Sequence, residues 1–277
     1  MNLQDEPLLF STDGAADAPS AGTARVTLVG AGPGDPELLT MKAVKALQQA
    51  KLVLYDHLVS KEVLKLVPEG ADLIYVGKES SRHTLPQDDI IKLMVRMAKN
   101  GRPLVRLKGG DGYIFGRGGE EAQALASAGV PFSVIPGLSA AQGAAASAGI
   151  PLTHRDHAQS LVFVTGHLHE NREVDLDWEM LARPRQTVVI YMGVGTLDII
   201  CRQLMAHGLP ADTPAALVER ATLPDERCIT GSVSTLPTLA IEHHVKPPAL
   251  IMIGQVVSLQ PLLSAAQRPR SLNAACR

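Results

Sequence analysis

Residues 28–40 read LVGAGPGDPELLT, and this stretch decides the fold because a short apolar strand runs into a glycine-rich turn and then into a helix. A dinucleotide-binding turn requires G-x-G-x-x-G, and here Gly30 and Gly32 fit while the third position is Asp35. Pro33 removes a backbone donor and Asp35 adds a negative charge, so the turn disfavours a pyrophosphate. The alternative is a tight strand-to-helix turn capped by Asp35, without a ligand.

Apolar runs of strand length alternate with amphipathic runs of helical length along the first half of the chain. This alternation predicts an α/β domain with a largely parallel sheet. The predicted strands are residues 26–30, 52–56, 73–77, 103–109 and 132–137, and the predicted helices are residues 36–50 and 86–101. Asp35 and Thr84 are the expected capping residues, and Gly101 follows the end of the second helix.

The second half of the chain predicts a second α/β domain. Its expected strands are residues 160–166, 186–193, 214–219, 227–232 and 248–254, with a clear helix over residues 196–208. The short spacing between strands around residues 217–232 favours antiparallel pairing and therefore a mixed sheet. Residues 138–156 are rich in Ala and Gly, which lets a helix pack very close to its neighbours. We expect domains at residues 24–138 and 139–262, with loose tails at residues 1–23 and 263–277.

Charge and cysteine content exclude several classes of function. Because 26 Lys and Arg oppose 28 Asp and Glu, no broad basic face for a nucleic acid is expected, and a few placed basic residues must meet any anionic ligand. Cys201, Cys228 and Cys276 lie far apart without a CxxC pair, which argues against a metal site and a disulfide framework and favours a reducing cytoplasm. The N-terminal segment lacks the pattern of a secretory signal, and no apolar run reaches the roughly 18 to 20 residues of a membrane helix.

A second glycine-rich stretch, RLKGGDGYIFGRGGEEAQAL at residues 106–125, contains the candidate binding residues. Its six glycines are more than a connector needs. Gly109–Gly110 would allow a ligand to lie against the backbone, and Asp111 can accept hydrogen bonds from ribose hydroxyls or an amine. Arg117 and Glu120 add charges in the same region. The alternative for these two residues is a solvated i, i+3 ion pair.

Six separated stretches of the sequence together carry a resemblance. They are GAGPGDPELLT, YDHLVS, YVGK, RLKGGDGYIFGRGGEE, PGLSAAQGAAASAGIPLTHRD and PPALIMIGQVV. In this order they resemble the S-adenosylmethionine-dependent tetrapyrrole methylases, and within that family the branch that methylates uroporphyrinogen III. The resemblance implies two α/β domains, a homodimer, and S-adenosylmethionine folded into the cleft between the domains rather than laid along the first sheet.

The resemblance also assigns residues to the cofactor and the substrate. The residues implied to line the cofactor pocket are Pro33, Gly109, Gly110, Asp111, Ile114, Ser139, Ala140, Met192, Ala221 and Ala249. Without the resemblance, Met192 would be assigned to the core, because it is an apolar residue at a strand end. The substrate carries several carboxylates, which planar bidentate donors bind best, so Arg117 and Arg155, with Glu120 beside them, are the expected substrate-binding residues.

The implied reaction is methylation of two neighbouring pyrrole rings, giving precorrin-2 by way of precorrin-1, a product that feeds sirohaem, cobalamin and haem d1 synthesis. A sulfonium methyl is already activated, so the protein chiefly aligns the partners and excludes water. The methylated ring must then lose a proton. By resemblance, Asp56 is the proton acceptor and Lys78 the donor. The third catalytic candidate, Arg117, stays protonated and therefore suits orienting carboxylates or stabilising charge.

Simpler roles are open for the same residues: Asp56 can cap the turn that leads to Ser60, and Lys78 can be an exposed lysine. The sequence departs from the family pattern at Gly112-Tyr113, where Pro-Phe is usual, at His57 and at Ala221-Thr222. Gly112 should loosen the cofactor loop. Other functions remain open as well: methylation of a later corrin intermediate or another substrate, nucleotide-dependent oxidation, and cofactor binding for regulation without turnover.

Overall fold

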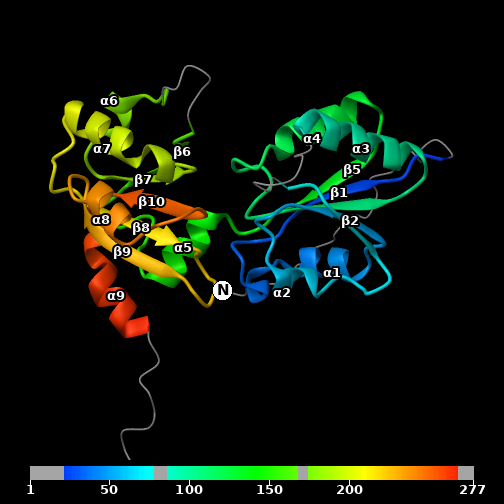
Figure 1. The fold of residues 1–277 in the computed structure, drawn as a ribbon, viewed down its shortest axis with the longest axis horizontal. Coiled ribbons are helices and arrows are strands. Elements are labelled where there is room, and N and C mark those ends of the chain that lie inside the picture. Colours follow the sequence, from blue (N-terminus) through cyan, green and yellow to red (C-terminus); the bar gives the residue numbers. More distant parts are fainter. Residues whose placement is uncertain (1–21, 78–85, 168–173, 268–277) are drawn as a thin grey trace, which may run out of the picture.

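The structure, a computed structural model, describes residues 22–77, 86–167 and 174–267, and these residues form two five-stranded sheets (Figure 1). The first sheet consists of β1 (Val26–Gly30), β2 (Leu52–Tyr55), β3 (Asp72–Tyr75), β4 (Leu104–Lys108) and β5 (Phe132–Ile135). The strand order is β3-β2-β4-β1-β5, and every neighbouring pair is parallel. The predicted parallel α/β sheet is confirmed.

Helices cover both faces of this first sheet (Figure 1). They are α1 (Met41–Gln48), α2 (Lys61–Leu64), α3 (Gln87–Lys99) and α4 (Gly118–Ser127), with a short 3-10 helix, η1 (Pro36–Leu38), before α1. Leu28 and Leu54 pack under α3 and α4, whereas Val29 and Val53 pack against α1 and α2. A parallel sheet buried on both faces requires apolar residues in both alternating sets, which explains the continuous apolar strands.

The prediction of one helix over residues 36–50 is wrong, because two separate caps divide the segment. Asp35 caps η1, its Oδ1 accepting a hydrogen bond from the backbone N–H of Glu37 (2.9 Å). Thr40 is extended and caps α1, its hydroxyl accepting from the N–H of Ala43 (3.2 Å). The predicted cap Thr84 lies outside the described residues. Gly101 follows α3 as expected, with a φ of +74°.

The second sheet is mixed, as predicted. It consists of β6 (Ser160–Thr165), β7 (Gln186–Tyr191), β8 (Pro214–Glu219), β9 (Arg227–Ser232) and β10 (Ala249–Ile253). The order is β6-β7-β10-β8-β9, with β6 and β7 parallel and the other pairs antiparallel. The accompanying helices are α5 (Ala140–Ala148), α6 (Trp178–Leu181), α7 (Leu197–Ala206), α8 (Leu236–Glu242) and α9 (Gln260–Gln267), with the 3-10 helices η2 (Val194–Thr196) and η3 (Gln255–Leu259).

Two layers of helices also enclose the second sheet. Leu181, Leu197 and Leu236 bring α6, α7 and α8 to one core cluster, and Ala141 and Ala144 bring α5 to the other. Because α5 packs on the second sheet, we retain the boundary between residues 138 and 139 as a proposal. Across the described ranges, none of the helices combines the length and the apolar character that crossing a bilayer requires.

Candidate functional site

Three glycine-containing loops meet where β1, β4 and β5 end. The N–H of Gly110 donates to the carbonyl of Gly32 (2.7 Å), and the N–H of Gly32 donates back to the carbonyl of Gly110 (3.1 Å). A Cβ on Gly30 would lie 2.5 Å from the backbone nitrogen of Gly137, and a Cβ on Gly137 would lie 2.4 Å from the oxygen of Gly110. The backbones therefore approach to a distance that only glycine allows.

Asp111 ties the second of these loops to the third. Its Oδ1 accepts from the N–H of Tyr113 (2.8 Å), and its Oδ2 accepts from the N–H of Gly137 (3.0 Å). Each carboxylate oxygen has a further lone pair, so these bonds leave acceptor capacity for a ligand. Asp111 thus braces the loops, and its contact with a cofactor stays a prediction.

The first glycine loop also contacts the second half of the chain. A Cβ on Gly143 of α5 would lie 2.4 Å from the Cβ of Pro33, so α5 lies directly against this proline. The N–H of Asp35 donates to the hydroxyl of Thr222, in the turn after β8 (3.2 Å). Pro33 and Asp35 therefore lie where the two halves of the chain meet, which is where the resemblance places a cofactor.

Aromatic rings link the second glycine loop to the second sheet. The ring of Phe115 lies 4.9 Å from that of Tyr191, which in turn lies 5.8 Å from Phe163. The hydroxyl of Tyr191 accepts a hydrogen bond from the N–H of Ala141 in the first turn of α5 (3.1 Å). Burial raises the pKa of Tyr191, and its bonds to Ala141 and Ser139 oppose this effect. The sequence analysis missed both Phe115 and Tyr191.

Left-handed backbone conformations gather at these loops. The residues concerned are Phe115 (φ 50°), Arg117 (φ 58°), Met192 (φ 54°), Arg220 (φ 49°) and Thr222 (φ 66°). Such conformations strain a residue with a side chain and concentrate at functional sites. Met192 is 54% exposed at the end of β7, so its assignment to the core by pattern alone is wrong. Its exposure agrees with the role that the resemblance implies.

The remaining predicted cofactor residues lie along the second half of the chain or face it. Ser139 is buried and caps α5, its hydroxyl accepting from the N–H of Gln142 (3.2 Å). Ala140 begins α5, Ala221 follows β8, and both pack with Ile114 against the core beneath the second sheet. Ala249 begins β10 and pairs with Glu219. Contact of these residues with a cofactor stays a prediction.

Arg117 and Glu120 form a paired, exposed set at the start of α4. Arg117 Nε lies 2.9 Å from Glu120 Oε1, and its second contact, to Oε2, is 2.6 Å. The side chains are 55% and 52% exposed. The hydrogen bond that Arg117 donates to Glu120 raises the pKa of Arg117 and lowers the pKa of Glu120. The i, i+3 pair named as the alternative is therefore present, and both groups stay accessible to a substrate.

Arg155, the other predicted substrate residue, is exposed in the segment between α5 and β6. Its carbonyl oxygen accepts a hydrogen bond from Arg185 (3.4 Å), and its guanidinium forms no ion pair with the part of the chain that the structure describes. Lys78, the predicted proton donor, lies outside the described residues. The substrate contact of Arg155 and the proton transfer by Lys78 stay predictions.

Asp56 lies in a turn held between the first and second glycine loops. Its Oδ1 accepts from the N–H of Leu58 (3.2 Å), so the capping geometry considered as an alternative is present. Ser60 donates to the carbonyl of Gly34 (2.7 Å), and a Cβ on Gly109 would lie 2.5 Å from the Cβ of Leu58. The side chain is 19% exposed, and its role as proton acceptor stays a prediction.

Behind Asp56 lies a set of charged side chains that the sequence analysis missed, here called the buried ionic cluster: Arg106, Lys108 and Glu121. Arg106 donates to Asp56 (3.3 Å) and to Glu121 (3.2 Å), and Lys108 donates to Glu121 (2.9 Å). All three are at most 4% exposed. Burial, and then the charge of Arg106, lower the pKa of Lys108, while Glu121 opposes them. The sequence signal that could have revealed this cluster is the pair Arg106 and Lys108, two charged residues inside the otherwise apolar strand β4.

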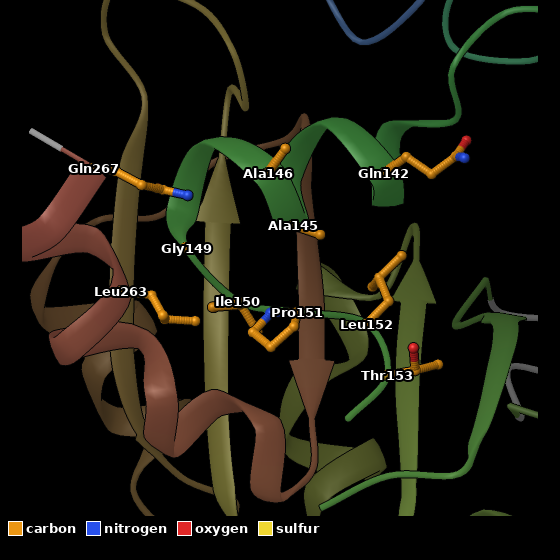
Figure 2. A pocket seen from close by; sticks show the side chains of 10 residues that line it. All are labelled: Gln142, Ala145, Ala146, Gly149, Ile150, Pro151, Leu152, Thr153, Leu263 and Gln267. Atoms are coloured by element: carbon orange, nitrogen blue, oxygen red, sulfur yellow. The ribbon is translucent and has the colours of Figure 1, made fainter. Parts of the chain in front are cut away.

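A separate hollow of about 430 Å³ lies between α5 and α9 (Figure 2). Its walls are mostly apolar and include Ala145, Ile150, Leu152 and Leu263. Among the residues that the structure describes, none of the predicted site residues lines it, and neither does any charged side chain. It therefore does not suit a ligand with several carboxylates, and the glycine loops remain the candidate site.

Comparison with known proteins gives one family. The family model "Tetrapyrrole (Corrin/Porphyrin) Methylases" matches residues 25–237. The siroheme synthase of Nitrosospira multiformis is 56% identical over 239 residues, which are 86% of this chain and 50% of that protein. The siroheme synthase of Nitrosomonas eutropha is 52% identical over 257 residues, or 93% of this chain and 53% of that protein. The chain thus spans about half the length of the curated relatives it matches.

Solved structures agree with this family. The uroporphyrin-III C-methyl transferase from Thermus thermophilus, complexed with S-adenyl homocysteine, is 42% identical with a TM-score of 0.73, covering 85% of this chain and 100% of that one. A cobalt precorrin-4 methyltransferase is 26% identical with a TM-score of 0.75, covering 87% of this chain and 99% of that one.

Proposed function

Because this chain belongs to the family of tetrapyrrole (corrin/porphyrin) methylases, we propose that it transfers two methyl groups from S-adenosylmethionine to uroporphyrinogen III, giving precorrin-2 by way of precorrin-1. The observation that carries the proposal is the meeting of Gly32 and Gly110 beside Pro33 and α5, at the carboxyl ends of parallel strands. Ligands of open α/β sheets bind at this end. The higher identity to the Thermus thermophilus enzyme, 42% against 26%, favours uroporphyrinogen III over a later corrin intermediate.

The residues around the glycine loops fit a folded sulfonium cofactor. Met192 and Tyr113 are each 54% exposed there, which supplies apolar surface for a ligand, and Asp111 retains acceptor capacity for its amine or hydroxyl groups. When bound, S-adenosylmethionine would supply a methyl group that is already activated. The protein therefore needs no strong nucleophile, and we assign it the tasks of aligning the two reactants and excluding water from the site.

Three groups of the chain then have distinct tasks. Asp56, partly exposed beside the loops, accepts the proton that the methylated ring loses. Arg117, with a planar guanidinium more than half exposed, binds the carboxylates of the substrate, and Glu120 fixes its orientation. We assign to the contact between Phe115 and Tyr191 the role of an apolar wall that excludes water from the site.

Two wider features also belong to the proposal. The curated relatives are named siroheme synthases, so we propose that the product feeds sirohaem synthesis. We further propose that the chain works as a homodimer, as its family resemblance implies. Sedimentation of the purified protein tests this, since a mass near 29.4 kDa, that of one chain, would contradict it.

Anaerobic incubation of the protein with uroporphyrinogen III and S-adenosylmethionine tests the reaction. We expect a tetrapyrrole heavier by two methyl groups and two molecules of S-adenosylhomocysteine per molecule of product. Asp56→Asn should lose most of this turnover, whereas Asp72→Asn, at an exposed aspartate of β3 paired with Arg102, should keep it.

Two other results would contradict the proposal. Methylation of a later corrin intermediate, but not of uroporphyrinogen III, would indicate that the protein is a methylase of that later intermediate. Binding of S-adenosylhomocysteine without methylation of any tetrapyrrole would indicate a regulator.

A further inference from the structure

The buried ionic cluster connects two elements that carry the proposed reacting groups. Glu121 lies in the first turn of α4. This helix begins at Gly118, directly after Arg117. Arg106 lies in β4 and contacts both Glu121 and Asp56. One guanidinium therefore spans from the helix that starts beside Arg117 to the turn that holds Asp56.

The guanidinium of Arg106 is fixed on all sides. Its Nε donates to Glu121 Oε1 (3.2 Å), one terminal nitrogen donates to the carbonyl of Leu107 (2.9 Å) and lies 3.5 Å from that of Leu54, and the other donates to Asp56 Oδ2 (3.3 Å). The side chain is 3% exposed. A planar, three-sided donor of this kind sets the direction of each partner, which the point charge of a lysine does not do.

Glu121 anchors this arrangement through one oxygen. Its Oε1 accepts from Arg106, from Lys108 (2.9 Å) and from Gln87 at the start of α3 (3.1 Å), and the side chain is fully buried. Two cations and two carboxylates, Asp56 included, give the assembly no net charge. Removing one partner would leave a buried charge uncompensated, which costs several kcal/mol.

Asp56 itself is held by two opposed contacts. Arg106 binds Oδ2 and the N–H of Leu58 binds Oδ1, so the carboxylate cannot rotate without losing one of them. The side chain of Asp56 nevertheless keeps an exposed fraction of 19%. Orientation of a proton acceptor to within a fraction of an ångström is what catalysis demands of such a group.

On the premise of the proposed function, we propose that Arg106, anchored by Glu121, is the positioning residue of Asp56. It sets the direction of the carboxylate and fixes it relative to α4 and Arg117. Arg106 and Glu121 do not touch the substrate, since both are buried behind Asp56. Their effect on the reaction therefore passes through Asp56.

Arg106→Lys tests this role because it keeps the positive charge and removes the planar guanidinium that donates in three directions. We expect kcat to fall about 10- to 100-fold, with KM for uroporphyrinogen III and the Kd of S-adenosylhomocysteine changed by less than about twofold. The matched control is Arg102→Lys, at an exposed pair with Asp72 on the same sheet, which should leave kcat unchanged. A folded Arg106→Lys protein with the kcat of the original enzyme would overturn the proposal.

A double-mutant cycle separates positioning from general support of the fold. If Arg106 acts through Asp56, Arg106→Lys in an Asp56→Asn background should lower kcat by less than about twofold further. A second loss as large as the first would overturn the proposal. Where Arg106→Lys does not fold, Glu121→Gln replaces it, because it keeps the shape and an accepting oxygen. The expected result is again a lower kcat at unchanged cofactor affinity.

Hydrogen exchange distinguishes failure of this inference from failure of the proposed function. Loss of the Arg106 guanidinium should speed amide exchange over residues 56–60 and at the start of α4, whatever the substrate is, and Arg102→Lys should not. An original enzyme that methylates no tetrapyrrole would remove the proposed function while leaving this result intact. Unchanged exchange over residues 56–60 would remove the positioning role while leaving the activity intact.

Discussion

The backbone N–H of Asp35 donates a hydrogen bond to the hydroxyl of Thr222, 187 residues further along the chain, at 3.2 Å. Thr222 has a φ of 66°, and its own N–H donates to Glu226 (2.6 Å). The turn after β8 is thus strained and held in place, and the hydroxyl of Thr222 in this turn accepts a hydrogen bond from the first glycine loop. This long-range bond therefore joins the first glycine loop to the second half of the chain.

Thr222→Val should weaken the junction between the two halves without changing its shape. The N–H of Asp35 then loses its acceptor, so we expect the free energy of unfolding to fall by about 1 kcal/mol. S-adenosylhomocysteine should bind more weakly in calorimetry. Thr230→Val, at an exposed position of β9, is the control and should change neither value. Equal urea unfolding curves for the original protein and Thr222→Val would contradict this reading.

Asp111→Ala should both loosen the glycine loops and weaken the binding of the cofactor. Two backbone donors, Tyr113 and Gly137, lose their acceptor, which should cost about 1–3 kcal/mol of stability. Asp111→Asn keeps only one accepting oxygen, so its losses should be intermediate. Calorimetric titration with S-adenosylhomocysteine measures the binding part, and an unchanged Kd in Asp111→Ala would remove this residue from the cofactor site.

Arg117→Ala should abolish most turnover while the protein stays as stable as before. An exposed ion pair contributes at most about 1 kcal/mol, so its loss should hardly move the melting temperature. Cofactor affinity should also persist, because the guanidinium is assigned to the substrate. Arg202→Ala, at an exposed pair with Asp198 on α7, removes a similar contact far from the reaction and should be fully active. Equal activity of the two variants would identify Arg117 as a surface arginine.

Cys201 should make stability fall at alkaline pH. Burial, with a smaller effect of Asp198, raises the pKa of this thiol from 9.0 to about 12. Above pH 9 the unfolded chain releases the proton and the folded chain does not, so stability is lost between pH 9 and 12. At pH 10 the loss from this group is about 1.4 kcal/mol. Urea unfolding of Cys201→Ala should show a correspondingly smaller decline between pH 7 and pH 10, and an identical decline would contradict the prediction.

The sequence predicted the architecture well because its strands are short, apolar and bounded by glycine or proline. Pro214–Glu219 and Arg227–Ser232 have the predicted bounds, and their close spacing gave the antiparallel pairing. The helix over residues 36–50 failed because Thr40 offers a second cap inside an otherwise helical pattern. Periodicity detects a helix face but does not register a competing cap.

The site was only partly predictable, for a different reason. Glycine composition located the loops, but sequence does not show that Gly30 and Gly137 pack backbone against backbone. Nor does it show a left-handed φ at Phe115 or Met192, since L-residues with side chains rarely adopt one. The burial of Arg106 and Lys108 could not be predicted without knowing that Glu121 of α4 pairs with them, and this pairing is set by tertiary packing rather than by local pattern.

The strand order β3-β2-β4-β1-β5 also bears on how the protein is made. The first strand of this sheet to be synthesised, β1, is flanked in the finished sheet by β4 and β5, which are synthesised last. Both edges of β1 therefore stay unpaired until β4 (Leu104–Lys108) has been synthesised, and its second edge stays unpaired until β5 (Phe132–Ile135) follows. Exposed edges of this kind invite pairing with another nascent chain. The first glycine turn, which borders the candidate site, thus follows the strand most in need of protection during its synthesis.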